Sequence, residues 1–219
     1  MVYKCKCVCF YTRLRIALEK HFGAVNALRA IPESIGCNAL KGGEGASFVS
    51  GGRDSMINLW TASGDCVGTQ AAHRGSVSFL SDLNFNLQYR PATAGAPMMF
   101  SLGTDNMVKI WDLKRFKTVV EFSVPLPGTL TKGVWADQFI VTASSNGSVK
   151  VWNYTSSSLG GGVCAGEAAV DSSLTSLTRS SDWTSKELSS HSQACTDLIS
   201  TDTFVASSSK SGHIYRWEK

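Results

Sequence analysis

One short pattern recurs four times in this chain and limits what it can fold into. The copies are FVSGGRDSMINLW (48–60), MFSLGTDNMVKIW (99–111), IVTASSNGSVKVW (140–152) and VASSSKSGHIYRW (205–217). In each copy two short, alternating runs flank a polar turn, which is the signature of a β-hairpin. Four copies of one hairpin indicate a repeat protein built from similar β units.

The repeat also carries a fixed set of polar residues and a tryptophan. A hydroxyl residue precedes each tryptophan by ten positions, and a polar turn residue precedes it by six. A histidine lies upstream of three of the copies, followed by a small residue and a leucine. The matched positions are His21, Ser50, Asp54 and Trp60; His73, Ser101, Asp105 and Trp111; Thr142, Asn146 and Trp152; and His191, Ser207, Ser211 and Trp217.

These motifs resemble the WD-repeat (β-transducin-like) β-propeller family, whose repeat folds as a four-stranded blade with a Gly-His…Trp-Asp signature. The resemblance implies an all-β propeller with about four recognisable blades. It also implies a structural hydrogen-bond network in each blade, from acid to imidazole, imidazole to hydroxyl, and hydroxyl to indole N–H. Leaving a buried N–H unpaired costs ~1–3 kcal/mol, so each group needs the next one. The chain departs from the signature in that only Trp111 is followed by an aspartate, Asp112.

The spacing of the repeats predicts blade boundaries. The Ser/Gly-rich segment 156–187 is predicted to be a flexible loop. Residues 1–20 are predicted to hold one or more stray outer strands, because RLRIALEK (13–20) stands where a fourth strand would precede His21. The predicted blades are residues 21–72, 73–122, 123–155 and 188–217.

The number of blades raises the question of how the ring closes. The last repeat ends with its third strand at Trp217, and in WD-repeat propellers an N-terminal strand completes the last blade. Four blades are fewer than the family usually has. We therefore favour an incomplete array that needs further blades, and the alternative is a small propeller that closes by itself or with a second copy.

Composition argues against several classes of partner. A net charge of +4 with no Lys/Arg run does not support nucleic acid or anionic lipid as a ligand. No apolar run approaches the ~20 residues that a membrane span needs, so we expect no direct membrane insertion. The seven cysteines include no CxxC pair, which favours free thiols and a cytoplasmic location.

Cys5, Cys7 and Cys9 alternate along a segment that would place them on one face of a strand. We weighed a thiolate metal site against a small apolar strand face. The apolar face is favoured because no His or fourth thiol stands nearby at a zinc-like spacing. We expect no metal site and no cofactor.

Catalysis is not expected. The sequence has no GxxxxGK[ST], GxSxG or HExxH motif, and the Ser, His and Asp residues of the repeat are expected to saturate one another. The predicted function is a non-catalytic scaffold or adaptor that presents one propeller face to a protein partner. The resemblance places that face beside the turns and histidine loops, at Phe22, Arg53, Arg74, Thr104, Ser145, Gln193 and Lys210. Three of these residues are basic, which suits an acidic or phosphorylated partner.

Two narrower functions remain as alternatives. One is a substrate receptor of a cullin-type ubiquitin ligase. Such receptors carry Trp-Asp-x-Arg, where this chain has Trp111-Asp112-Leu113-Lys114. Lysine lacks the planar fork that makes arginine bidentate. The other is the terminal propeller of a BEACH-type membrane-trafficking scaffold, which GAVNALRAIP and AHRGSVSFL faintly resemble.

Overall fold

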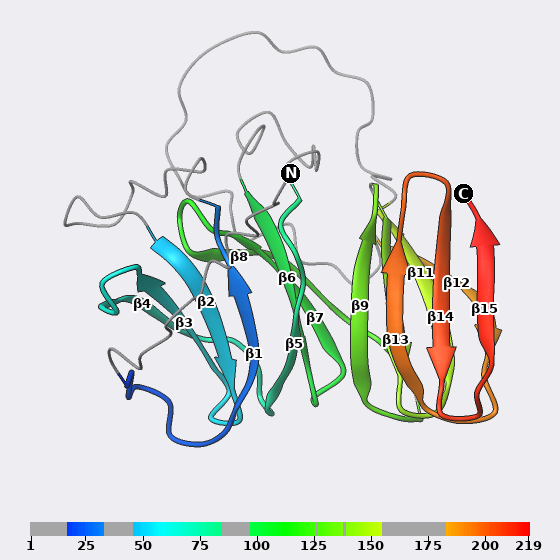
Figure 1. Ribbon diagram of the computed structural model, residues 1–219, viewed down its shortest axis with the longest axis horizontal. Coiled ribbons are helices and arrows are strands. Elements are labelled where there is room, and N and C mark those ends of the chain that lie inside the picture. Colours follow the sequence, from blue (N-terminus) through cyan, green and yellow to red (C-terminus); the bar gives the residue numbers. More distant parts are fainter. Residues whose placement is uncertain (1–16, 33–45, 85–96, 126, 138, 155–182) are drawn as a thin grey trace, which may run out of the picture.

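The protein is described by a computed structural model, and every regular element among its described residues is a β-strand (Figure 1). The structure describes residues 17–32, 46–84, 97–125, 127–137, 139–154 and 183–219. In these residues no helix is long and apolar enough to cross a membrane. The strands are β1 (Val25–Ala30), β2 (Ala46–Gly52), β3 (Met56–Thr61), β4 (Cys66–Ala71), β5 (Val77–Leu80), β6 (Met98–Gly103), β7 (Met107–Asp112), β8 (Lys117–Ser123), β9 (Leu130–Ala136), β10 (Phe139–Ser144), β11 (Ser148–Tyr154), β12 (Trp183–Ser190), β13 (Cys195–Ser200), β14 (Phe204–Ser209) and β15 (Ile214–Glu218).

The strands form four antiparallel sheets that follow the chain in order. Sheet 1 is β1-β2-β3-β4, sheet 2 is β5-β6-β7-β8 and sheet 3 is β9-β10-β11-β12. Sheet 4 has three strands, β13-β14-β15. Each predicted hairpin is the pair of second and third strands of a sheet, so the four-copy repeat corresponds to four structural units.

The same turn conformation closes each of these hairpins. The residue five positions before each tryptophan has a positive φ, at Ser55 (71°), Asn106 (58°), Gly147 (92°) and Gly212 (81°). Glycine adopts this conformation without steric cost and asparagine tolerates it, which is why small or polar residues stand here in all four copies.

The core consists of three layers, each between two consecutive sheets. Between sheets 1 and 2, Val49, Ile57 and Leu59 pack in one cluster with Met99 and Trp111. The clusters between sheets 2 and 3 and between sheets 3 and 4 are built in the same way around Trp152 and Trp217. Burial of these alternating apolar side chains against the next sheet stabilises the array, because each sheet alone would leave both faces in water.

One predicted boundary is wrong. The end of the expected loop 156–187 is not a loop, because residues 183–187 lie in β12, which pairs with β11 as the fourth strand of sheet 3. The predicted fourth blade, 188–217, therefore begins too early, since residues 188–190 also belong to β12 and the first strand of sheet 4 starts at Cys195. Residues 156–182 lie outside the described residues.

The predictions for the N-terminal segment are tested only in part. Residues 17–20 are described and form no strand. Residues 1–16, with Cys5, Cys7 and Cys9, lie outside the described residues. Residues 33–45 and 85–96, which connect the first and second strands of sheets 1 and 2, also lie outside the described residues.

Candidate functional site

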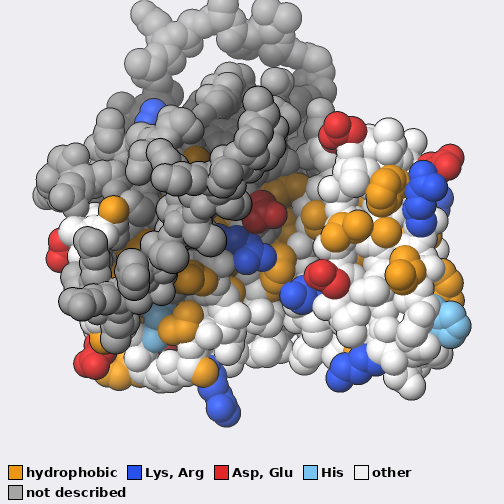
Figure 2. All heavy atoms as spheres, viewed as in Figure 1, with side chains coloured by type: hydrophobic (Ala, Val, Ile, Leu, Met, Phe, Trp, Pro, Cys, Tyr) orange, Lys and Arg blue, Asp and Glu red, His pale blue; other side chains and the backbone are white. Residues whose placement is uncertain are grey.

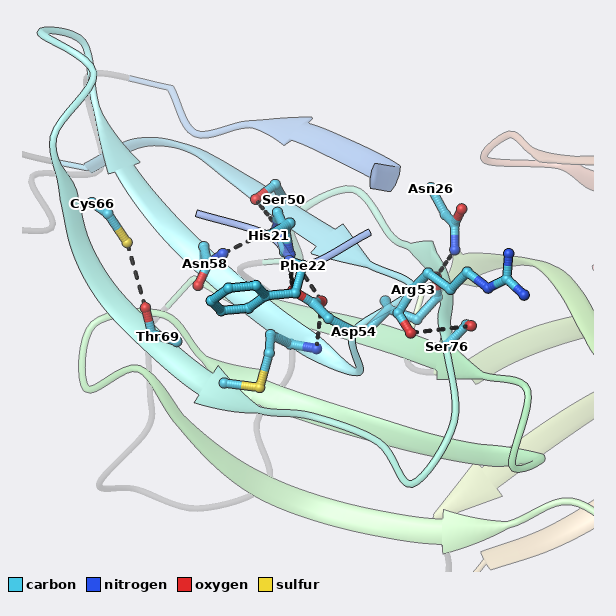
Figure 3. Close-up of polar contacts among 12 residues, drawn as sticks. His21, Phe22, Asn26, Ser50, Arg53, Asp54, Asn58, Cys66, Thr69 and Ser76 are labelled. Carbon is cyan, nitrogen blue, oxygen red and sulfur yellow. Dashed lines mark hydrogen bonds and ion pairs between the residues drawn. The ribbon is translucent and has the colours of Figure 1, made fainter. Parts of the chain in front are cut away.

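Four polar side chains of sheet 1 form a continuous hydrogen-bonded chain (Figure 3). Trp60 donates its indole N–H to the hydroxyl of Ser50 at 2.8 Å, and that hydroxyl lies 2.7 Å from Nε2 of His21. Nδ1 of His21 lies 3.0 Å from the carboxylate of Asp54, which also accepts the backbone N–H of Phe22 at 2.9 Å. The chain joins the loop before β1, strands β2 and β3, and the turn between them.

Sheet 2 repeats this arrangement. Trp111 donates to the hydroxyl of Ser101 at 2.9 Å, Ser101 lies 2.8 Å from Nε2 of His73, and Nδ1 of His73 lies 3.0 Å from Asp105. Asp105 accepts the backbone N–H of Arg74 at 2.8 Å. The acid therefore fixes both the histidine ring and the residue that follows the histidine.

Two pKa shifts bear on these networks, that of the histidine in sheet 2 and that of the acid in sheet 1. Burial lowers the pKa of His73, although the negative charge of Asp105 opposes this shift. Desolvation raises the pKa of Asp54, but hydrogen bonds from His21 and from the N–H groups of Phe22 and Met56 hold it below its usual value overall. With a neutral ring, Nδ1–H donates to the acid and Nε2 accepts the hydroxyl proton. Ser50 and Ser101 are buried, so neither hydroxyl is an exposed nucleophile.

In sheets 1 and 2, a glycine makes room for the pair of histidine and aspartate side chains. A Cβ at Gly103 would stand 2.3 Å from Oδ1 of Asp105 and 2.4 Å from Nδ1 of His73, and Gly52 meets the same two groups in sheet 1. This glycine position was not among the predicted site residues. The signal was present, because serine replaces glycine there in the two copies with an incomplete polar set, at Ser144 and Ser209.

Sheet 3 keeps only part of the chain. Trp152 donates to the hydroxyl of Thr142 at 2.9 Å, as its counterparts do. Asn146 instead accepts the hydroxyl of Ser144 and the backbone N–H of Ser148, so it closes its own turn. This agrees with the absence of a histidine in the third copy.

Sheet 4 keeps the histidine, but only one of its two ring nitrogens has a hydrogen-bond partner. Nε2 of His191 lies 2.6 Å from the hydroxyl of Ser207, while its buried Nδ1 has no hydrogen-bond partner. Ser211, at the position of the acid, binds Ser209 at 2.6 Å and His213 at 2.9 Å instead. The partly exposed Trp217 makes no hydrogen bond to Ser207, so the structure does not bring it into the predicted network.

The predicted partner-binding residues lie together along one rim of the array, the lower edge in Figure 1, where the second strand of each sheet turns into the third. In every sheet, one backbone hydrogen bond holds this edge. It joins the residue before the polar turn position to the loop before the first strand. The bonds are Arg53 N–H to Ala24 at 2.8 Å, Thr104 to Ser76 at 2.9 Å, Ser145 to Thr129 at 2.9 Å and Lys210 to Ala194 at 3.0 Å.

The side chains of the rim are open to solvent. Arg53, Arg74 and Lys210 are exposed, as are Thr104, Ser145 and Gln193, and Phe22 has 94% of its surface accessible. Figure 3 shows the guanidinium of Arg53 extending away from the sheet, and Figure 2 shows Lys and Arg side chains projecting from the same edge. We call Arg53, Arg74 and Lys210 the basic rim.

The basic rim has little opposing charge near it. None of its three cations forms an ion pair in the described part of the chain. The acids of the same turns, Asp54 and Asp105, have only 7% and 12% of their side chains exposed and are bound to histidines. Within the described ranges, no group of three or more His, Cys, Asp or Glu side chains is placed to hold a metal ion.

Comparison with known proteins supports the repeat assignment. Residues 134–153, which cover β10 and most of β11, match the family described as WD domain, G-beta repeat. The fold of the whole chain resembles the crystal structure of the computationally designed Ika4 protein, with a TM-score of 0.61, 20% sequence identity, and coverage of 94% of this chain and 98% of that one. No curated protein matches the sequence.

A second designed protein, Ika8, matches with a TM-score of 0.58 and 21% identity over 93% of this chain and 48% of that chain. The protein thus spans about half the length of Ika8 and nearly all of Ika4. Both are designed propeller proteins. The chain has the fold of a β-propeller array, and residues 134–153 match a WD repeat. Sheets 1 to 4 are its blades 1 to 4, and no ring is closed in the described part of the chain.

In this propeller array, the hydrogen-bonded side chains of blades 1 and 2 also hold the backbone of the rim. Their acids bind the backbone N–H of Phe22 and Arg74, which are two of the predicted contact residues. The buried acids therefore fix the backbone of these rim residues, while the side chains of the rim stay exposed to solvent.

Proposed function

We propose that the protein is a non-catalytic interaction scaffold whose basic rim binds an acidic or phosphorylated segment of a partner protein. WD-repeat propellers are suited to protein interaction, and their rigid blades hold turn residues in fixed positions. The observation that carries the proposal is the rim itself, where cations from blades 1, 2 and 4 are exposed and pair with no carboxylate of the described residues.

The anchored backbone of the basic rim supports binding of an anionic ligand at a defined place. The backbones of Arg53 and Lys210 are anchored by equivalent bonds, and that of Arg74 is anchored by Asp105. Arginine recognises carboxylate and phosphate groups through its planar fork, and a rim charge increases the rate of encounter with an oppositely charged partner. We expect the protein to act in the cytoplasm.

The test is binding of acidic and phosphorylated peptides from a defined library, measured by fluorescence anisotropy. The triple variant Arg53→Glu/Arg74→Glu/Lys210→Glu should bind the best peptide at least tenfold more weakly, with an unchanged thermal midpoint. The matched control, Lys114→Glu/Lys117→Glu/Lys186→Glu, makes the same change in net charge at exposed positions away from the rim turns. It should bind normally. Equal losses in both variants, or no binding by any peptide, would contradict the proposal.

The cullin-receptor alternative gains no support from the geometry around Asp112. The carboxylate of Asp112 is buried and accepts the backbone N–H groups of Lys114 at 2.8 Å and Arg115 at 3.2 Å. It closes the turn between β7 and β8 and is not presented to a partner. No contact in the described part favours the BEACH-type alternative, so the scaffold function is the one we propose.

A further inference from the structure

Phe22 is the most exposed large apolar side chain among the described residues, with 94% of its surface accessible. It follows His21 in the loop before β1. The residues that follow the other two histidines of the repeat, Arg74 and Ser192, are also exposed, although a preceding blade packs against blades 2 and 4. Exposure at this position is therefore a property of the repeat and does not depend on which blade lies next to it.

The backbone that carries Phe22 is fixed on both sides of the residue (Figure 3). The N–H of Phe22 donates to the carboxylate of Asp54 at 2.9 Å, and that carboxylate lies 3.0 Å from Nδ1 of His21. Gly23 follows with a φ of 152°, a conformation that other residues rarely adopt. Because this loop is already ordered, a partner that contacts the ring loses little affinity to the ordering of backbone.

Two arginines come next to Phe22 along the rim. Arg53 donates its backbone N–H to Ala24, in the loop of Phe22, at 2.8 Å. The hydroxyl of Ser76 lies 3.5 Å from the carbonyl oxygen of Arg53, so Arg53 also contacts the loop that holds Arg74. Figure 3 shows the ring of Phe22 and the guanidinium of Arg53 extending in different directions, the guanidinium on the side of Ser76. The order across blades 1 and 2 is thus an apolar group followed by two cations.

The rest of the rim adds no second apolar contact among the predicted residues. Three further contact residues are exposed and polar, namely Thr104, Ser145 and Gln193. The acids of the first two turns, Asp54 and Asp105, are largely buried against histidines. Aromatic side chains and arginines are the residues that contribute most at protein interfaces, whereas a lipid surface needs a larger apolar face. One aromatic ring beside two arginines therefore favours a protein segment as the occupant.

We propose that the rim recognises two features of its partner at once. An apolar side chain of the partner packs on Phe22, and a carboxylate or phosphate beside it in the same segment binds Arg53 and Arg74. This inference rests on the proposed function and narrows its partner to segments in which an apolar residue stands close to an acidic or phosphorylated one. A segment with charge alone would leave the ring in water, and a segment with the apolar residue alone would leave both arginines without an anion.

Fluorescence anisotropy with labelled peptides of one length tests both features. The first peptides carry a leucine at each neighbouring position of a phosphoserine, the second carry serine in place of the leucine, and the third carry serine in place of the phosphoserine. A parallel set with glutamate in place of phosphoserine separates the two sources of the anion. The best peptide with both features should bind the wild type at least tenfold more tightly than either of its single-feature counterparts.

Substitutions at Phe22 identify the apolar contact. Phe22→Ser should remove the preference for leucine, so that the two anionic peptides bind equally, while Phe22→Leu should keep it. The side chain is exposed, so the thermal midpoint should stay unchanged in both variants. Phe139→Ser is the matched control, because Phe139 is a 40% exposed phenylalanine at the start of β10, at the end of that strand away from the rim turn. This control should bind as the wild type does.

Salt separates the two contributions. Higher ionic strength should weaken the binding of every anionic peptide, because exposed charges are screened, but should leave the ratio between the leucine and serine peptides unchanged. If Phe22→Ser binds the leucine peptide as tightly as the wild type, while the triple charge reversal of the basic rim abolishes binding, this inference is wrong and the proposed function stands. A wild type that binds vesicles containing an anionic lipid in preference to every peptide would overturn both.

Discussion

The hydroxyl of Ser101 accepts one hydrogen bond from Trp111 and lies within hydrogen-bond distance of His73, so two side chains depend on a single oxygen atom. The buried histidine also needs a hydrogen-bond partner at Nδ1, and Asp105 provides it. The glycine at position 103 matters as much, because any side chain there would collide with the histidine and the acid.

We predict that Asp105→Ala is more destabilising than Ser211→Ala. Removing Asp105 leaves Nδ1 of a buried histidine and the N–H of Arg74 without their acceptor, and hydrogen bonds to charged groups contribute ~1.5–3 kcal/mol. Ser211 binds only a neighbouring serine and an exposed histidine. Chemical denaturation should show a clear drop in midpoint for the first variant and little change for the second. Equal shifts would be inconsistent with the network.

The orphaned Nδ1 of His191 gives a second prediction. Ser209→Gly combined with Ser211→Asp should stabilise blade 4, because it recreates the glycine and acid that serve His73. Ser211→Asp alone should give less, since the Ser209 side chain occupies the place that Gly103 leaves free. A double-mutant cycle should give a coupling of ~0.5–3 kcal/mol in the unfolding free energy. Additive effects of the two changes would show that the glycine is not needed.

Among the elements, β12 is the one whose place depends most on contacts from outside its own sequence. Its residues WTSKELSS show no clear apolar alternation, and they follow a Ser/Gly-rich tract. The strand pairs with β11 along its whole length, and its first residue, Trp183, stacks on Phe122 of blade 2 with ring centroids 4.5 Å apart.

Truncating that side chain tests the position of β12. Trp183→Ala should lower the free energy of unfolding by ~3–5 kcal/mol, as expected when a large aromatic is removed from a core. Trp183→Phe, which keeps a stacking ring, should cost much less. If residue 183 belonged to a solvated loop, the alanine variant would unfold at the same denaturant concentration as the wild type.

For the whole molecule, stability should vary along the array because each blade contacts only its neighbours. Blade 2 is covered on both faces and its central strand β6 is buried throughout, whereas β15 is an edge strand with mostly exposed residues. Amide hydrogen exchange at low protein concentration should therefore be slowest in β6 and β7 and fastest in β15. Uniform protection across the four blades would contradict this gradient.

Local sequence determined much of this protein. The alternation around each polar turn sets the hairpins, and the positive-φ position requires small or polar residues. The spacing of His21, Ser50, Asp54 and Trp60 brings these side chains together once β1 pairs with the hairpin. These features depend on residues within one repeat, so a reader of the sequence can place them.

Tertiary structure decided the rest. Whether Trp183 begins a strand depends on β11 and on Phe122, which lie far from it in the sequence. Whether Trp217 donates a hydrogen bond to Ser207 depends on how β14 and β15 lie in blade 4. The exposure of Leu28 and the burial of Leu80 follow from which blade lies next to each, although the two residues occupy the same repeat position. A repeat specifies the faces of its blade, and only its neighbours in space determine which of those faces are covered.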